Sequence, residues 1–179
     1  MSPGRAPSWN VIAGVASTSW LESIVPSSDG RVLLPVELRK RVSWASPKRS
    51  LSLLATTLGD GAVVVAPLSE RSDEIGAVGA VLEAAPAAER ASLVFAAMAI
   101  YARVSLQPDG RLRLSPGLAR RLAPTGDEPV WIGAHSDQVW LWPEAAWSAM
   151  LSSAADALRD AVDGHRARSE GDDVARSTG

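Results

Sequence analysis

Two short stretches of the chain alternate apolar and polar residues, and each follows an Asp-Gly pair. Val32 and Leu34 are the apolar positions of the first stretch, and Leu112 and Leu114 are those of the second. Alternate residues of a β-strand point to the same face of a sheet. Asp-Gly is a strong signal for a tight turn because glycine readily accepts a positive φ. The pattern therefore predicts two β-hairpins, each with one buried face.

These hairpins belong to a longer internal repeat. The segment from Asp29 to Val42 aligns without a gap with the segment from Asp109 to Leu122, which lies 80 positions later. Further along the chain, residues 60–67 align with residues 136–143 at an offset of 76. The first copy thus holds four extra residues, which we place in the loop around Ala45 to Ser50. So ordered a series indicates that one module occurs twice.

Each copy is predicted to form a strand, a turn, a second strand, a short helix and a further hairpin. Pro35 and Pro116 suit the start of the short helices, where the missing N–H is not needed. The remaining strands are expected at residues 21–26, 51–57 and 62–66 in the first copy, and at residues 102–106, 130–134 and 139–142 in the second. Together these elements predict an α+β chain with a β-rich core.

Helices are predicted after each copy. Ser72 is a candidate N-cap for a helix with acidic residues in its first turn, and Pro86 separates that helix from a second one. Pro143 opens a last helix, in which the apolar residues from Trp147 to Val162 fall on one face. The boundaries that follow are 1–19 for an N-terminal extension, 20–67 for the first module, 68–100 for the linking helices, 101–147 for the second module, 148–163 for the rest of the last helix, and 164–179 for a polar tail expected to be disordered, as are residues 1–8.

The composition and the motifs exclude several classes of function. Cysteine is absent, which rules out disulfides, thiolate nucleophiles and cysteine-ligated zinc. The longest apolar stretch, residues 93–102, is far shorter than the roughly 20 residues that span a bilayer, and no signal peptide is evident, so we expect a cytoplasmic protein. His135 and His165 are isolated, and no nucleophile–base pattern or phosphate-binding loop occurs. We therefore expect no enzyme, metal, cofactor or small-molecule substrate.

Basic residues concentrate in the first copy. The formal net charge of the chain is −2, but residues 20–67 carry +2, residues 68–100 carry −3, residues 101–147 carry zero and residues 148–179 carry −2. Local potential, rather than total charge, steers a polyanion. The basic runs Arg39-Lys40-Arg41 and Lys48-Arg49 are therefore candidate contacts for nucleic acid, although such a run is also typical of a solvated helix end.

The repeated unit resembles a known family. A strand-turn-strand-helix unit with Gly-Arg, three apolar positions and Pro is similar to the AbrB-type swapped-hairpin module, and two copies in one chain resemble the MraZ family of bacterial transcription regulators. The run from Val139 to Glu144, followed by Trp147, is similar to the strand and helix that end the family's module. The resemblance implies hairpins interlocked in one barrel as a pseudodimer, assembly into homo-oligomers, and binding of double-stranded DNA in the nucleoid. The family's acidic position, four residues before the arginine, falls on Ser27 and Gln107.

Arginines beside the turns are the principal candidates for DNA contact. A guanidinium next to a hairpin turn can reach phosphate oxygens or a guanine edge with its planar fork. The candidate set is Arg31, Arg39, Lys40 and Arg41 in the first copy, and Arg111, Arg113, Arg120 and Arg121 in the second. Arg31 and Arg111 could instead form structural ion pairs, for example with Asp29.

Two other functions remain open from the sequence. The chain could be a protein-interaction or assembly module that has lost operator binding, or an antitoxin-like partner whose C-terminal segment wraps a toxin. Seven tryptophans are many for this length, and four of them lie between Trp131 and Trp147. Packing in the core or at a subunit interface is the favoured role for these side chains, and stacking on nucleic-acid bases is the alternative.

Overall fold

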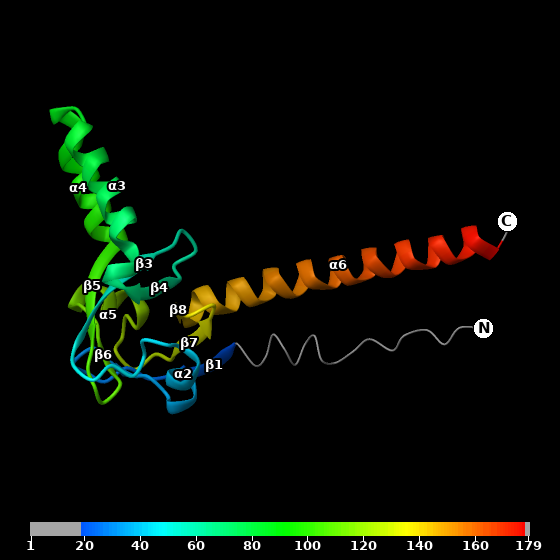
Figure 1. Ribbon diagram of the computed structural model, residues 1–179, viewed down its shortest axis with the longest axis horizontal. Helices are drawn as coiled ribbons and strands as arrows, with labels where there is room; N and C mark the ends of the chain where they lie inside the picture. The colour runs from blue at the N-terminus through cyan, green and yellow to red at the C-terminus, as the bar shows by residue number, and fades with distance from the viewer. Residues whose placement is uncertain (1–18, 178–179) are drawn as a thin grey trace.

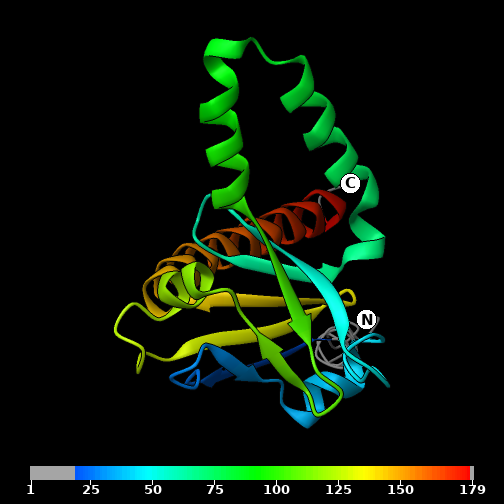
Figure 2. The same cartoon turned by 90° about the vertical axis from the view of Figure 1, so that its left-hand side faces the viewer.

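The computed structural model describes residues 19–177, with side chains as far as residue 166 and that of residue 168. Within this part of the chain, eight antiparallel strands form one sheet that curls into a nearly closed barrel, and five α-helices accompany it (Figures 1 and 2). The strands are β1 (Trp20–Ile24), β2 (Arg31–Leu33), β3 (Leu51–Thr57), β4 (Val63–Pro67), β5 (Tyr101–Leu106), β6 (Arg111–Arg113), β7 (Val130–His135) and β8 (Gln138–Pro143). The helices are α2 (Val36–Arg41), α3 (Ser72–Ala84), α4 (Ala87–Ile100), α5 (Pro116–Leu122) and α6 (Glu144–Ser177), with a 3₁₀ turn, η1 (Leu68–Arg71), before α3. The α+β prediction is confirmed; the predicted N-terminal extension, apart from Ser19, lies outside the described residues.

The strands of the two copies complete one another's sheet. β1 of the first copy pairs with β7 of the second, and β5 of the second pairs with β3 of the first. The pairs β2–β6 and β4–β8 also join the two copies. In β2–β6, Val32 lies opposite Leu112, its own equivalent in the repeat, and in β4–β8 Val64 lies opposite its equivalent, Trp140. Exchanging the two copies therefore leaves the pairing register of the strands unchanged.

The register also locates the four extra residues of the first copy. Ile24 pairs with Val130, and its equivalent Val104 pairs with Leu53, so β3 and β7 are related by an offset of 77. Three extra residues therefore precede β3, and the fourth lies in the β3–β4 turn. The prediction that all four extra residues lie around Ala45 to Ser50 is therefore wrong for the fourth residue. The matching β7–β8 turn has only two residues, Ser136 and Asp137, and both adopt positive φ without being glycine.

Equivalent side chains from both copies share a single core. Each of these residues is at most 5% exposed: Val32 and Leu112, Leu34 and Leu114, Leu38 and Leu118, Val42 and Leu122. The alternation after each Asp-Gly pair places Val32 of β2 and Leu112 of β6 inside the barrel, as predicted. Leu53, Ile132 and Leu141 from the hairpins fill the rest of the same core.

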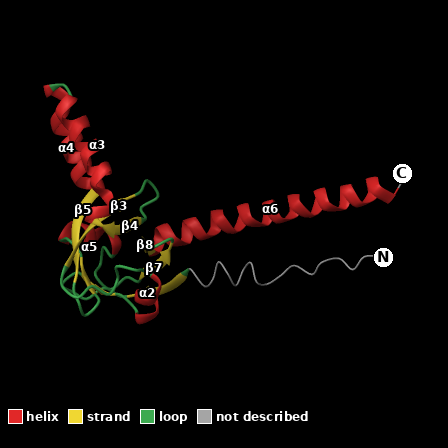
Figure 3. Cartoon of the chain, viewed as in Figure 1, coloured by secondary structure: helices red, strands yellow, loops and turns green. Residues whose placement is uncertain are grey.

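The helices that follow each copy leave the barrel. Figures 1 and 3 show α3 and α4 as a helical hairpin that projects from one side of the barrel, and α6 as a single long helix that projects from another. Pro86 separates α3 from α4, as predicted, but Ser72 is the first residue of α3 rather than its cap, and its hydroxyl donates to the Ser69 carbonyl at 3.0 Å.

The last helix is longer than the sequence predicts. α6 continues through Ser177, so the prediction of a disordered tail from residue 164 is wrong for the described part. The segment contains no proline, and ion pairs one turn apart support the helix, such as Arg159 with Asp156 and Arg166 with Asp163. The helix continues through both of its glycines, Gly164 and Gly171.

Replacing Gly30 with Ala is expected to lower the free energy of unfolding by about 1–2 kcal/mol, because φ is +74° at this position and an L side chain in the left-handed region is strained. An added Cβ would also lie 3.2 Å from the Ala119 Cβ atom. Gly59→Ala is the matched control, since no positive φ occurs there and nothing lies within 4 Å of the added Cβ. Urea denaturation of both variants measures the difference, and equal stabilities would contradict the turn geometry.

Candidate nucleic-acid interface

The pair β2–β6 forms a short antiparallel ribbon with one strand from each copy. Arg31 lies opposite Arg113 and Leu33 lies opposite Arg111. Val32 and Leu112, the middle residues of the two strands, are buried. The residues before and after them in each strand therefore point outward. In Figure 2 both strands lie on the side of the barrel that faces the viewer, and α6 recedes behind it. The outer face of the ribbon therefore carries three arginines and one leucine.

The two turns that lead into the ribbon hold it in place. The Gly30 carbonyl accepts a hydrogen bond from the Leu114 N–H at 3.1 Å, and the Gly110 carbonyl accepts one from the Leu34 N–H at 2.9 Å. Each turn thus bonds to the strand end of the other copy. Both glycines have positive φ, +74° and +88°, which explains the Asp-Gly pairs.

Each turn aspartate pairs with the arginine two residues later. Arg31 contacts Asp29 at 3.1 Å, and Arg111 contacts Asp109. All four side chains are about half exposed. Exposed ion pairs of this kind contribute little to stability, so both guanidinium groups can exchange a carboxylate for another anion at small cost. The ion pairs of Arg31 and Arg111 are therefore compatible with binding of an anionic ligand by the same two side chains.

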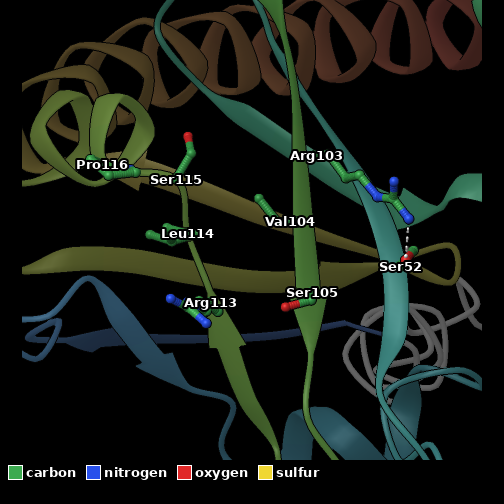
Figure 4. A pocket seen from close by; sticks show the side chains of 8 residues that line it. All are labelled: Ser52, Arg103, Val104, Ser105, Arg113, Leu114, Ser115 and Pro116. Atoms are coloured by element: carbon green, nitrogen blue, oxygen red, sulfur yellow. Dashed lines mark hydrogen bonds between the residues drawn. The ribbon is translucent and has the colours of Figure 1, made fainter.

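A fourth arginine extends the charged surface. Arg31, Arg111 and Arg113 line a cavity of about 280 Å³, and Arg113 also lines a neighbouring cavity of about 370 Å³ together with Arg103 of β5 (Figure 4). Arg103 donates to the Ser52 hydroxyl at 3.0 Å. We name Arg31, Arg103, Arg111 and Arg113 the arginine band. The sequence comparison missed Arg103 because its equivalent in the first copy is Ser23.

The helix arginines have structural contacts. Arg41 donates to the Ser19 carbonyl at 3.1 Å, and Arg121 donates to the Ala99 carbonyl at 2.7 Å and to the Thr57 hydroxyl at 2.8 Å. Ser19 and Ala99 are equivalent positions, so both copies fasten the start of a strand to the short helix in the same way. Neither side chain lines the cavities formed by the ribbon arginines, and each has a guanidinium nitrogen bonded to a backbone carbonyl.

The remaining candidates differ in position. Arg39 packs against Gly110, where an added Cβ would lie 2.9 Å from its Cζ atom, and its buried Nε has no partner. Lys40 is exposed and contacts Glu37 at 2.7 Å. Arg120 is exposed and lines a cavity beside the first turn, with Asp29 and Gly30. Of the helix candidates, Arg39 and Arg120 thus lie beside a ribbon turn, and Arg120 is the exposed one of the two.

Ser27 and Gln107, which occupy the family's acidic position, have different contacts. The Ser27 hydroxyl donates to Asp29 at 2.5 Å and accepts from the Arg31 N–H at 3.1 Å. The Gln107 amide donates instead to the Ser50 hydroxyl at 3.1 Å. Ser27 therefore orders the first turn, whereas Gln107 ties the second turn to the loop before β3.

Trp131 and Trp142 of the β7–β8 hairpin pack together with Trp147 at the start of α6. Trp131 stacks on Trp147 with ring centroids 4.9 Å apart, and Trp142 meets Trp147 edge-on at 5.3 Å. The Trp131 indole N–H donates to Glu144 at 2.7 Å. This cluster anchors the first turns of α6 to the barrel, which fits the packing role favoured from the sequence.

Residues 19–177 contain no cluster of three or more His, Cys, Asp or Glu side chains placed to hold a metal ion, as far as those side chains are described. None of the described helices has the length and hydrophobicity needed to cross a membrane. No protein-family model matches the chain, and no curated protein is significantly similar to it.

The turn carboxylates have lowered pKa values for different reasons. The hydrogen bond from the Ser27 hydroxyl is the largest cause for Asp29, with the charge of Arg31 contributing less. For Asp109 the largest cause is the backbone N–H of Arg111, followed among the lowering contacts by its side chain. A lowered carboxyl pKa stabilises the fold above the ordinary value of 3.8, and this contribution is lost as the pH falls through the folded pKa.

Ser27→Ala is expected to raise the pKa of Asp29 more than Arg31→Gln does, because the hydroxyl is the stronger cause. Gln107→Ala, the equivalent change in the second copy, should leave the pKa of Asp109 unchanged, since Gln107 bonds to Ser50. Carboxyl ¹³C shifts followed between pH 2 and 6 give both values. A larger effect at Asp109 than at Asp29 would contradict the assigned contacts.

Proposed function

We propose that this chain is a MraZ-like, sequence-specific DNA-binding regulator of transcription, built as a swapped-hairpin pseudodimer. The exchanged pairing of β1 with β7 and of β5 with β3 supports the pseudodimer. The observation that carries the DNA-binding proposal is the arginine band, three of whose members lie on a two-stranded ribbon with one strand from each copy. The major groove of B-form DNA admits a two-stranded β-ribbon.

The charge balance of the ribbon favours a polyanionic ligand. The four arginines of the band stand against two carboxylates, Asp29 and Asp109, so the surface keeps two net positive charges in a chain whose total is −2. Like charges directly opposite each other destabilise a sheet, yet Arg31 and Arg113 face each other across β2–β6. An anion bound between them would remove this repulsion.

Replacing both Arg31 and Arg111 with Ala is expected to abolish retardation of a duplex DNA probe and to leave the barrel folded, since both side chains are exposed. The affinity of the unchanged protein should fall steeply with salt because bound phosphates release counterions. A gel-shift titration at several salt concentrations measures both effects, with circular dichroism as the check of folding.

The control for this experiment removes the same charge elsewhere. Arg159 and Arg166 are exposed on α6, on the far side of the barrel from the ribbon. Their double Ala variant should retard the probe as the unchanged protein does. Unchanged retardation by the Arg31 and Arg111 variant would overturn the proposal.

The α3–α4 hairpin favours a second function, assembly of the chain into homo-oligomers. No residue of either helix is buried, and Phe95 and Met98 are 70% and 71% exposed on α4. No charged side chain occurs between Arg90 and Arg103, so two copies of this face can meet without repulsion. A helix that is apolar all round is normally covered, and a second α4 is the partner that this uncharged surface fits.

Single cysteines test the assembly because the chain has none of its own. Phe95→Cys and Met98→Cys are expected to form disulfide-linked dimers under mild oxidation, since the α4 helices of two copies would lie together. Val25→Cys, at a position that is 62% exposed on the barrel, is the control and should stay monomeric on a non-reducing gel. If the unchanged chain is monomeric in sedimentation and neither helix variant cross-links, self-assembly through α4 is wrong.

A further inference from the structure

The four outward positions of the ribbon are not equivalent in the two copies. Arg31 and Arg111 occupy the same position of the repeat, and each has its own turn aspartate. Leu33 and Arg113 also occupy the same position of the repeat, but their chemistry differs. Leu33 is apolar and 56% exposed. Arg113 carries a guanidinium with no ion-pair or side-chain hydrogen-bond partner among the described residues. Exchanging the copies preserves the backbone register but not the surface.

The same imbalance extends beyond the ribbon. Arg103 of the second copy is equivalent to Ser23 of the first, so the second copy supplies three of the four arginines of the band. Against these three stands one carboxylate, Asp109, whereas in the first copy Arg31 is balanced by Asp29. The net positive charge of the surface therefore lies over the second copy.

The two unlike side chains also have unlike chemistry toward base edges. An arginine fork donates two hydrogen bonds to the O6 and N7 atoms of guanine. A leucine has no donor and can make only apolar contact, for which the methyl group of thymine is the available partner in the major groove. Leu33 and Arg113 thus face the two halves of a bound duplex with different requirements.

We propose that each barrel binds duplex DNA in a single orientation, on a sequence without internal twofold symmetry, with Arg113 and Leu33 as the residues that distinguish its two halves. The inference rests on the proposed DNA binding and specifies the kind of site. A protein surface with true twofold symmetry matches a palindromic site. Here the backbone of the ribbon has that symmetry and the side chains break it, so the matching site is not palindromic.

Two substitutions restore the symmetry of the four ribbon positions and so test the proposal. Leu33→Arg gives four arginines at the four positions, and Arg113→Leu gives two arginines and two leucines. Selection from a library of duplexes with random sequence is carried out with the full chain and with each variant. The unchanged chain is expected to select a non-palindromic motif, and both variants should select palindromic ones. Arg113→Leu should bind the original motif roughly 5- to 150-fold more weakly, the equivalent of one arginine–guanine pair.

A matched control separates symmetry from charge. Val36 is 55% exposed on α2, much like Leu33, but it lies off the ribbon. Val36→Arg adds the same charge and should select the same motif as the unchanged chain. A palindromic motif from the unchanged chain, or one motif shared by the unchanged chain and both ribbon variants, would overturn the proposal. If no protein enriches or retains any duplex, the proposed DNA binding itself has failed.

Orientation gives a second, independent measurement. A DNA-cleaving iron chelate attached to Val25→Cys is carried on the first copy only. On a duplex with one copy of the selected motif, cleavage is expected on one side of the motif, and with the Leu33→Arg ribbon on its own palindromic motif it should occur on both sides. Cleavage on both sides of the original motif by the labelled chain with its natural ribbon would show that it binds in two orientations and would contradict the proposal.

Discussion

The pairing of β2 with β6 is the interaction on which the rest of the structure depends. It brings Val32 of one copy against Leu112 of the other, and from this centre the register extends symmetrically in both directions. Three-residue strands supply few hydrogen bonds of their own, so the carbonyls of Gly30 and Gly110 add a bond at each end. The pairing fixes the inner face of the barrel and its outer face together, because adjacent residues of a strand point to opposite faces of the sheet.

That constraint distinguishes arginines that a count of charges treats alike. Arg31 and Arg113 each lie next to a buried residue of the same strand, Val32 or Leu112, so their guanidinium groups face solvent. Arg41 and Arg121 lie at the ends of short helices, where they can reach carbonyls of a preceding segment, and they do so at equivalent positions. Arg41, the last residue of the run Arg39-Lys40-Arg41, therefore stabilises the fold through its bond to the Ser19 carbonyl. The arginines on the strands form the exposed band.

The sequence was sufficient for the elements that repeat and insufficient where the copies differ. Alternation around Val32 and Leu112 predicted the strands and the buried face, since burial imposes a period of two. The fourth extra residue of the first copy was misplaced because residues 51–59 lie between the two aligned blocks, and only the strand register shows that it belongs to the β3–β4 turn. Arg103 could not be found by comparing the copies, because Ser23 stands at the equivalent position. Which strands pair across the copies depends on contacts distant in sequence, and no local pattern specifies them.

Symmetry is strict inside the barrel and relaxed on its surface, and packing explains the difference. A buried position must fit its own equivalent, as Val32 fits Leu112, so a change of chemistry there would leave a cavity or an unpaired polar group. Exposed positions have no such partner to satisfy. Leu33 can differ from Arg113 without cost to the core, because both side chains are exposed. A duplicated chain can thus keep the twofold backbone that closes the barrel while its ligand-facing side chains become different in the two halves.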